Sequence, residues 1–185
     1  MSASRATDGN RVLLSRFESP LGGLVAGAIA EGICLLEFTD PQRLTAQLEA
    51  LRRRMQLPIQ DGENEHTRRL EEELDLYFTF TGRLSTFSVP LVPVGSRFER
   101  QVWKAVRGIP YGQTRTYGQI ARGLGLPRAF RAVGRANGQN PISILIPCHR
   151  VIGNGGKLVG YGGGLWRKER LIELESGQAT LPPAR

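Results

Sequence analysis

Residues 116–137 read TYGQIARGLGLPRAFRAVGRAN, and they determine how the second half of this 185-residue chain is predicted to fold. The first four residues match a capping box, which predicts a short helix that runs through Leu124. A glycine and a proline then break the helix, and another helix is predicted over 128–137. Two short helices joined by a glycine-containing turn are typical of helix-turn-helix DNA-binding proteins, and also of helical hairpins that never bind DNA.

Helices are also predicted on either side of this stretch. The capping box SRFE at 96–99 begins a helix that ends before Ile109 and Pro110. A C-terminal helix is predicted from Leu165 to Ser176, with a glycine directly after it as a stop signal. The second half of the chain is therefore expected to be mostly helical.

The first half is predicted to be a small unit of strands and helices. Short apolar runs at 11–17, 23–30 and 33–38 indicate strands, and apolar residues recur at helical spacing after Pro41 and over 65–80. No catalytic constellation is recognised there, so this half is interpreted as scaffold. The expected fold is α+β or α/β, with a small sheet-and-helix domain before a mostly helical domain that holds the helix-turn-helix. The predicted parts are a scaffold domain at 1–86, a linker at 87–95, a DNA-binding and catalytic domain at 96–177, and a tail at 178–185.

The basic charge lies in the second half. Residues 1–95 carry 10 arginines and 13 acidic residues, whereas residues 96–185 carry 15 lysines and arginines and 4 acidic residues. The net charge of +8 thus divides into −3 and +11. A membrane surface would also attract such charge, but no amphipathic basic helix with an aromatic face is seen. Nucleic acid is therefore the favoured partner.

Cysteine usage and the start of the chain indicate the compartment. Cys34 and Cys148 are too few for a disulfide framework, and no Cys/His cluster has zinc-ligand spacing. The first twenty residues lack the apolar segment of a secretory signal. We expect a cytoplasmic protein with free thiols and with no membrane anchor, metal or cofactor.

The stretch ILIPCHRVI at 144–152 places a thiol, an imidazole and a guanidinium side by side in an apolar run. A buried strand with an inert cysteine is one interpretation, but such a strand does not normally hold a histidine and an arginine. A reactive thiol needs a base, which His149 can supply, or a positive local field, which Arg150 can supply. A base also needs an orienting group, usually a carboxylate. Either the chain turns at Pro147, or His149 reaches Cys148 through a water molecule. The acids available in this half are Glu99, Glu169, Glu173 and Glu175.

The PCHRV stretch at 147–151 resembles the active-site signature of the O6-alkylguanine-DNA alkyltransferases, or methylated-DNA–protein-cysteine methyltransferases. Further segments are similar to family motifs in order and spacing: IPYG at 109–112, TYG at 116–118, RAVG at 131–134, NP at 140–141, ILIP at 144–147 and GYGGG at 160–164. The resemblance covers residues 96–176, with only the general layout agreeing before them. It is that of a short bacterial-type member without a metal-binding regulatory domain.

The resemblance implies direct-reversal DNA repair. The cysteine at position 148 would take the alkyl group from O6 of guanine in duplex DNA, irreversibly and once per protein molecule, and O4 of thymine is left open as a second substrate. His149 would act as the base through a water molecule, and Glu175 would orient it. Asn140 would tie the helix-turn-helix to the active-site segment.

The resemblance also implies that the damaged base leaves the duplex before the sulfur reaches it. Arg131 would enter the base stack, and Tyr117 would crowd the phosphate that follows the lesion. Gly118, Arg135 and Asn154 are further candidates for DNA contact. The remaining pocket candidates are Val151, Leu158, Tyr161 and Gly162. Tyr161 is expected to pack within the protein rather than to stack on a base, and the amide of Gly162 would contact O6 of the guanine. The expected partner is double-stranded DNA, which a monomer of the protein would bind in the minor groove independently of the base sequence. Cooperative binding along the DNA is left open.

Two residues depart from common family members. Arg135 lies where small residues are usual, which predicts stronger phosphate binding. Ser143 stands where some members have a pocket proline, which predicts a pocket that accepts bulkier alkyl groups.

Two other classes of function compete with repair. A regulator with a helix-turn-helix would bind DNA in a sequence-dependent way, and lesion-marking relatives of the alkyltransferases lack the cysteine that is present here as Cys148. A Cys-His hydrolase would instead turn over repeatedly and would need an oxyanion hole.

Overall fold

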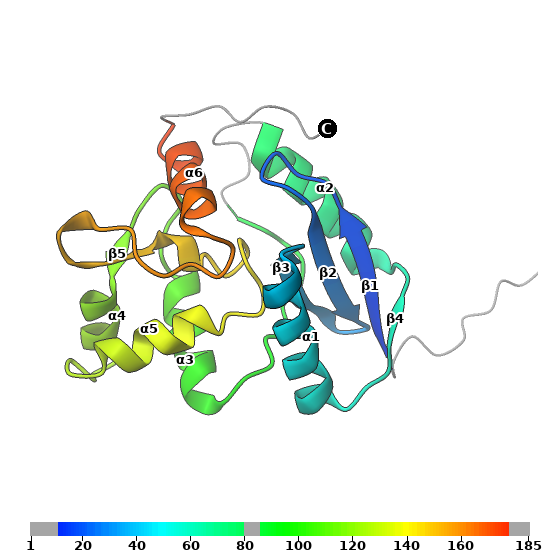
Figure 1. Ribbon diagram of the computed structural model, residues 1–185, viewed down its shortest axis with the longest axis horizontal. Helices are drawn as coiled ribbons and strands as arrows, with labels where there is room; N and C mark the ends of the chain where they lie inside the picture. The colour runs from blue at the N-terminus through cyan, green and yellow to red at the C-terminus, as the bar shows by residue number, and fades with distance from the viewer. Residues whose placement is uncertain (1–10, 80–85, 178–185) are drawn as a thin grey trace, which may run out of the picture.

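The computed structural model describes residues 11–79 and 86–177 (Figure 1). Its first half is built on a four-stranded sheet with the strand order β3-β2-β1-β4. The first three strands pair in antiparallel fashion, and β4 lies parallel to β1. In chain order the strands are β1 (Val12–Phe17), β2 (Leu24–Ile29), β3 (Gly32–Phe38) and β4 (Ile59–Asp61).

The tight turn between β2 and β3 depends on a glycine. Gly32 has a φ of 144°, and a Cβ atom there would lie 2.4 Å from the carbonyl oxygen of Pro90. The segment around Pro90 is held against this turn, because the amide of Ile33 donates to the Pro90 oxygen at 2.8 Å. Only glycine fits such a close approach of two backbones.

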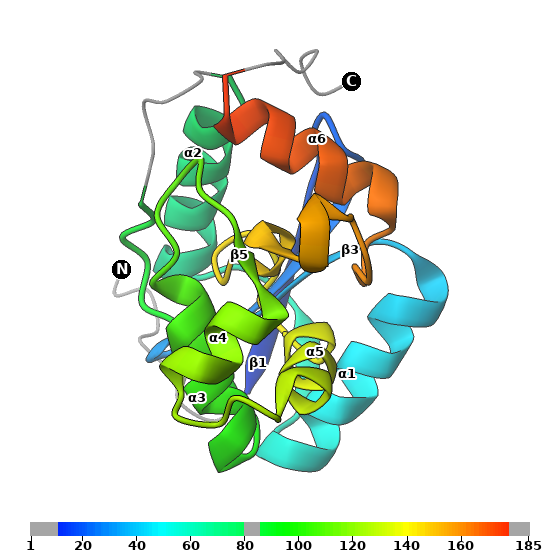
Figure 2. The same cartoon turned by 90° about the vertical axis from the view of Figure 1, so that its left-hand side faces the viewer.

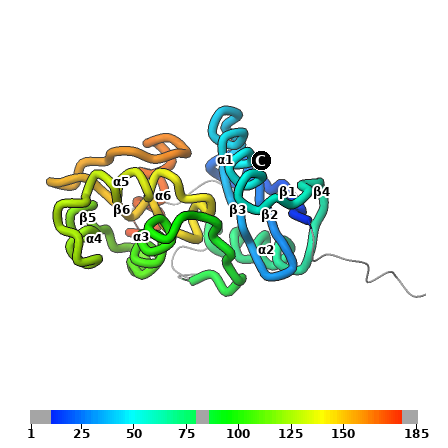
Figure 3. The backbone as a smooth tube through the Cα atoms, turned by 90° about the horizontal axis from the view of Figure 1, so that it is seen from below, coloured from blue at the N-terminus to red at the C-terminus, as the bar shows by residue number. Residues whose placement is uncertain are grey.

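Two helices cover opposite faces of the sheet, as the view from below shows (Figure 3). Helix α1 (Pro41–Met55) packs Leu51 against the cluster that includes Cys34, and helix α2 (Glu65–Thr79) buries Leu70 and Leu74 against the other face. Strands β2 and β3 are buried along their whole length because both of their faces are covered. The predicted strands and helices of the first half are therefore confirmed.

The second half is mostly helical, as predicted, and both of its predicted capping boxes are present, at Ser96 and at Thr116. The longer helix predicted from 128 begins two residues later, because residues 126–129 close a turn in which the Ala129 amide donates to the Leu126 carbonyl at 2.8 Å. The elements are α3 (Arg97–Arg107), β5 (Arg115–Thr116), α4 (Tyr117–Gly123), α5 (Phe130–Gly138), the 3-10 turn η2 (Cys148–Arg150), β6 (Val151–Ile152), the 3-10 turn η3 (Asn154–Gly156) and α6 (Leu165–Glu175).

The two halves share backbone hydrogen bonds and a hydrophobic core. The Leu36 amide of β3 donates to Pro141 at 2.9 Å, and the Ser143 amide donates back to Leu36 at 2.7 Å. One cluster of buried side chains includes Tyr77 of α2 and Trp103 of α3. The segment that leads to Cys148 is therefore fixed to the edge of the sheet. The division of the chain into parts at 1–86, 87–95 and 96–177 remains a prediction. The predicted tail at 178–185 lies outside the described residues.

Within residues 11–79 and 86–177, none of the helices has the length and apolar character that crossing a membrane would require.

Candidate active site

The chain turns sharply at the candidate nucleophile. The apolar run at 144–152 is not one strand, because Pro147 has φ −78° and ψ 65° and the next three residues form the 3-10 turn η2. Of the two routes considered for bringing His149 toward Cys148, the backbone turn at Pro147 is present. It buries the thiol, the imidazole and the guanidinium of Arg150 together.

Of the four acidic residues considered from the sequence, Glu175 forms hydrogen bonds with this turn. Its position at the end of α6 places its Oε1 atom 2.8 Å from Nε2 of His149. Arg150 holds both carboxylate oxygens, with Nε 2.7 Å from Oε2 and Nη2 2.9 Å from Oε1. The carboxylate is therefore clamped by two neighbouring residues of one turn.

The protonation of this pair follows from burial and charge. Burial alone would raise the pKa of Glu175, but its interactions with His149 and Arg150 outweigh burial and hold that pKa below its usual range. Burial lowers the pKa of His149 despite the opposing effect of Glu175. The neutral imidazole then carries its proton on Nε2, facing the carboxylate. Its Nδ1 atom has no hydrogen-bond partner among the described residues, so its lone pair can accept a proton.

Cys148 is a thiol rather than a thiolate when nothing assists it. Its side chain lies in the interior, and burial raises its pKa to about 11, with the Asn140 side chain acting in the opposite direction. Arg43 and Lys168 also lower the pKa of the thiol, whereas the Glu37 carboxylate raises it. A nucleophile at this position therefore needs a base to remove its proton.

Two buried asparagines connect α5 to the segment that carries Cys148. Asn140 donates from Nδ2 to the Ile146 carbonyl at 2.8 Å and accepts from the Ile142 amide at 3.0 Å. Asn137, which sequence reasoning missed, donates to the Cys148 carbonyl at 3.3 Å. Its spacing of three residues from Asn140 on a helical turn was the signal available in the sequence.

The predicted pocket wall is held by a buried lysine. Lys168 of α6 donates from Nζ to the carbonyls of Val151 at 2.6 Å and Val159 at 2.7 Å. Leu158 is half-buried in this loop, and the hydroxyl of Tyr161 is buried with no partner among the residues described. Sequence reasoning missed Lys168, since a lysine in a helix with several charged residues gives no sign that it is buried.

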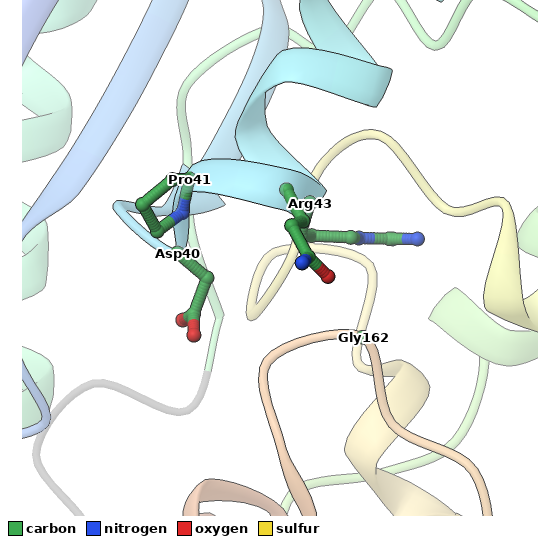
Figure 4. Close-up of a pocket in the computed structure, with 5 residues that line it drawn as sticks. Asp40, Pro41, Arg43 and Gly162 are labelled. Atoms are coloured by element: carbon green, nitrogen blue, oxygen red, sulfur yellow. The ribbon is translucent and has the colours of Figure 1, made fainter.

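The first half of the chain also reaches the site, although it was interpreted as scaffold. Arg43 of α1 donates to the Glu37 carboxylate at 2.8 Å, to the Gly138 carbonyl at 2.8 Å and to the Asn140 carbonyl at 3.1 Å. Its guanidinium extends beside the loop that carries Gly162, where a Cβ atom would lie 2.6 Å from it (Figure 4). A side chain at position 162 would therefore displace the guanidinium of Arg43.

A surface hollow of about 580 Å³ lies where α1 meets this loop. It is lined by Asp40, Pro41, Gln42, Arg43 and Gly162, four of which are labelled in Figure 4. Cys148 is not among its lining residues, so this hollow is not a direct opening to the thiol.

Ser143 is held by a hydrogen bond to the first half of the chain. Its side chain is buried, and Oγ donates to the Glu37 carboxylate at 3.3 Å. The predicted tolerance of bulky alkyl groups at this position remains a prediction.

The predicted DNA contacts lie around α4 and α5, which Figure 2 shows side by side toward the viewer. Tyr117 begins α4, and its hydroxyl donates to the Val159 carbonyl at 3.2 Å. Arg131 and Arg135 are exposed on α5, one helical turn apart. A hollow of about 390 Å³ beside them is lined by Thr116, Tyr117, Gly118, Arg122, Pro127, Phe130, Gly153 and Asn154.

Phe130 is a candidate contact residue that sequence reasoning missed. Its side chain is 48% exposed, and the guanidinium of Arg131 lies 5.7 Å from the centre of its ring. A large exposed aromatic beside exposed arginines is typical of a binding surface rather than of a solvated helix.

The family model and similar known proteins all point to one protein family. Residues 97–177 match the family model described as 6-O-methylguanine DNA methyltransferase, DNA binding domain. A methylated-DNA–protein-cysteine methyltransferase of Methanosarcina acetivorans is 44% identical over 160 residues, which cover 86% of this chain and 95% of that protein. A protein of the same name from Mycolicibacterium paratuberculosis is 58% identical over 104 residues, covering 56% of this chain and 62% of that one.

Solved structures agree with the sequence comparison. The crystal structure of Mycobacterium tuberculosis OGT in complex with DNA is similar with a TM-score of 0.74 and 41% identity, covering 89% of this chain and 92% of that one. A structure of the Mycobacterium tuberculosis O6-methylguanine methyltransferase gives a TM-score of 0.75 at 40% identity, with 91% and 94% covered. Since the likeness extends over both halves of the fold, the chain with this buried cysteine, histidine and glutamate belongs to the methylated-DNA–protein-cysteine methyltransferase family.

Proposed function

We propose that this protein repairs DNA by transferring the alkyl group from O6 of guanine to Cys148, once per molecule. The observation that carries the proposal is the buried arrangement of Cys148, His149 and Glu175 in a chain of this family. The thiol is next to an imidazole whose Nδ1 is available as a base, and the carboxylate holds the other ring nitrogen.

The proposed chemistry is a displacement at an sp³ carbon. Cys148 passes its proton through a water molecule to Nδ1 of His149, and the sulfur then attacks the alkyl carbon. The new S–C bond forms as the C–O6 bond breaks, and the electron pair of that bond stays on the guanine. The guanine takes up one proton, which balances the proton that the thiol released. The thioether is not hydrolysed, so the protein is consumed.

The proposed binding mode uses α4 and α5 as a helix-turn-helix in the minor groove of duplex DNA. Arg131 replaces the extruded nucleotide in the stack, Tyr117 crowds the neighbouring phosphate, and Arg135 contacts a phosphate. The exposed guanidinium groups on α5 and the excess positive charge of this half support the proposal. Contacts of this kind read backbone and shape rather than sequence, as a repair protein requires.

Mass spectrometry of the protein after incubation with O6-methylguanine duplex DNA tests the proposal. We expect one added methyl group per molecule, located on the peptide that contains Cys148 and saturating at one equivalent. The Cys148→Ser variant is expected to take up none. The matched control is Cys34→Ala, because Cys34 is also buried, in β3, and burial raises its pKa to about 12.

The competing functions give different results in the same assay. A hydrolase would turn over many times and would leave no stable adduct, and a sequence-dependent regulator would leave the lesion in place. Either result, or methyl transfer by the Cys148→Ser variant, would contradict the proposal.

A further inference from the structure

The carboxylate at the centre of the site also accepts a hydrogen bond from the first half of the chain. Tyr77 lies on α2, 98 residues away in sequence, and its hydroxyl is 2.7 Å from Oε1 of Glu175. Burial and the neighbouring carboxylate raise the pKa of Tyr77, so the phenol keeps its proton and is the donor. The bond is enclosed, since both side chains belong to the interior.

Packing does not explain the hydroxyl of Tyr77. Its ring lies edge-on to Phe78 at 5.1 Å and to Tyr111 at 6.2 Å between ring centres, and it is tilted against Phe87 at 5.5 Å. A phenylalanine would make the same ring contacts. The hydroxyl adds one thing, which is the hydrogen bond to Glu175.

Three donors share the oxygen that faces His149. Oε1 of Glu175 accepts from the Tyr77 hydroxyl, from Nε2 of His149 and from Nη2 of Arg150. Each donor stabilises the negative charge of the carboxylate, and a carboxylate with fewer donors binds the remaining ones more strongly. The Tyr77 hydroxyl therefore weakens the hydrogen bond between Glu175 and Nε2 of His149, and with it the stabilisation of the protonated imidazole.

We propose that Tyr77 is a positioning residue for alkyl transfer, which fixes the orientation of Glu175 and limits how strongly that carboxylate favours the protonated form of His149. The inference rests on the proposed function for its kinetic consequence. It assigns the first half of the chain a part in the proton transfer that activates Cys148, in addition to its structural role.

The other groups that face His149 set the background for this effect. Arg150 on the same turn and Lys168 on α6 both disfavour the charged imidazole, and Glu175 on α6 favours it. Tyr111, in the loop before β5, lies edge-on to Tyr77 and 5.7 Å below the guanidinium of Arg150. Removing the Tyr77 hydroxyl leaves all of these groups in place.

The direct test is an NMR titration of the histidine rings in wild type and in Tyr77→Phe. The chain contains two histidines, so His66 is an internal reference and a His66→Gln variant assigns the signals. We expect the His149 midpoint to rise by about half a pH unit in Tyr77→Phe and the His66 midpoint to stay unchanged. A 3-fluorotyrosine at position 77 keeps the hydroxyl as a stronger donor, and is expected to lower the His149 midpoint.

The kinetic test is the rate of methyl transfer from duplex DNA between about pH 5 and pH 8. The acid limb, where His149 becomes protonated, is expected to move to higher pH by the same amount in Tyr77→Phe. The packing control is Phe78→Leu, which is expected to lower the melting temperature while leaving the limb in place. The inference is overturned if the His149 midpoint stays at its wild-type value, or if it moves down in Tyr77→Phe.

These readouts separate the inference from the proposed function. The NMR titration needs neither DNA nor alkyl transfer, so it decides the coupling between Tyr77 and His149 even if the methyl-transfer assay fails. If wild type transfers the methyl group normally and the pH profiles of wild type and Tyr77→Phe superimpose, the proposed function stands and the role of Tyr77 is rejected.

Discussion

Among the described residues, the carboxylate of Glu175 accepts hydrogen bonds from five donor atoms, which come from His149, Arg150, Tyr77 and the amide of Gly112. The side chains of Tyr77, His149 and Arg150 are buried, so these donors cannot turn to water if the carboxylate is removed. At the scale of single residues, Glu175 is therefore expected to stabilise the fold and, in the proposed mechanism, to orient His149.

We expect Glu175→Gln to destabilise the protein by about 3–5 kcal/mol, because the guanidinium of Arg150 stays buried without a counter-charge. The free energy of unfolding in urea measures this. The pKa of Glu175 is lower in the folded protein than in the unfolded chain, so its contribution is full above about pH 4.3 and is lost as the pH falls further. The variant should therefore lose less stability than wild type between about pH 5 and pH 3, and parallel acid curves for the two proteins would contradict this assignment.

Ser143 allows a second prediction at this scale. Its amide donates to Leu36 of β3 and its hydroxyl donates to Glu37, so Ser143→Pro removes both hydrogen bonds, whereas Ser143→Ala removes only the second. We expect a loss of about 1 kcal/mol for Ser143→Ala and of about 3 kcal/mol or more for Ser143→Pro, measured by thermal unfolding. Equal losses for the two variants would show that the backbone pairing at this position contributes nothing.

At the scale of elements, capping boxes and turns were predictable and the pairing of distant segments was not. Ser96 and Thr116 sit in patterns that are local in sequence, and both cap the helices that they predict. The short strand β4 has a single apolar residue, Ile59, and forms because β1 offers it an edge to pair with. The turn at Cys148 could be predicted only as one of two alternatives, because it interrupts a run whose composition is that of a strand.

Helix α5 carries a prediction of its own. We expect Phe130→Ala to weaken binding to duplex DNA by about tenfold, because an apolar ring beside Arg131 can wedge against the bases of the minor groove. Fluorescence anisotropy at several salt concentrations measures this. The slope of log K against log salt should stay unchanged in Phe130→Ala, and should fall by about one in Arg135→Ala, which removes the proposed phosphate contact.

The control for this experiment is Leu76→Ala. Leu76 is exposed to a similar degree, 44% against 48% for Phe130, but lies on α2 in the other half of the chain. The assignment of Phe130 to the proposed DNA-binding surface would be wrong if Phe130→Ala bound DNA as tightly as wild type. It would also be wrong if Leu76→Ala lost as much DNA affinity as Phe130→Ala.

At the scale of the whole molecule, the site is shared between the two halves, and this is where sequence reasoning reached its limit. The residues from Cys148 to Glu175 follow motifs that lie within one part of the chain. Arg43 and Tyr77 belong to the first half, and no local pattern shows that α1 and α2 reach the site. Contacts between residues about 100 positions apart depend on the packing of a shared core, which a pattern of apolar residues does not specify.

The burial of Cys148 has a consequence for measuring DNA damage. If each molecule keeps its methyl group inside the fold, the fraction of methylated protein would increase with the number of lesions that have been removed. The peptide with Cys148 would record the events, and the peptide with Cys34, which is also buried, would serve as the internal standard. The ratio of modified to unmodified molecules would then report the past exposure of a cell to alkylating agents.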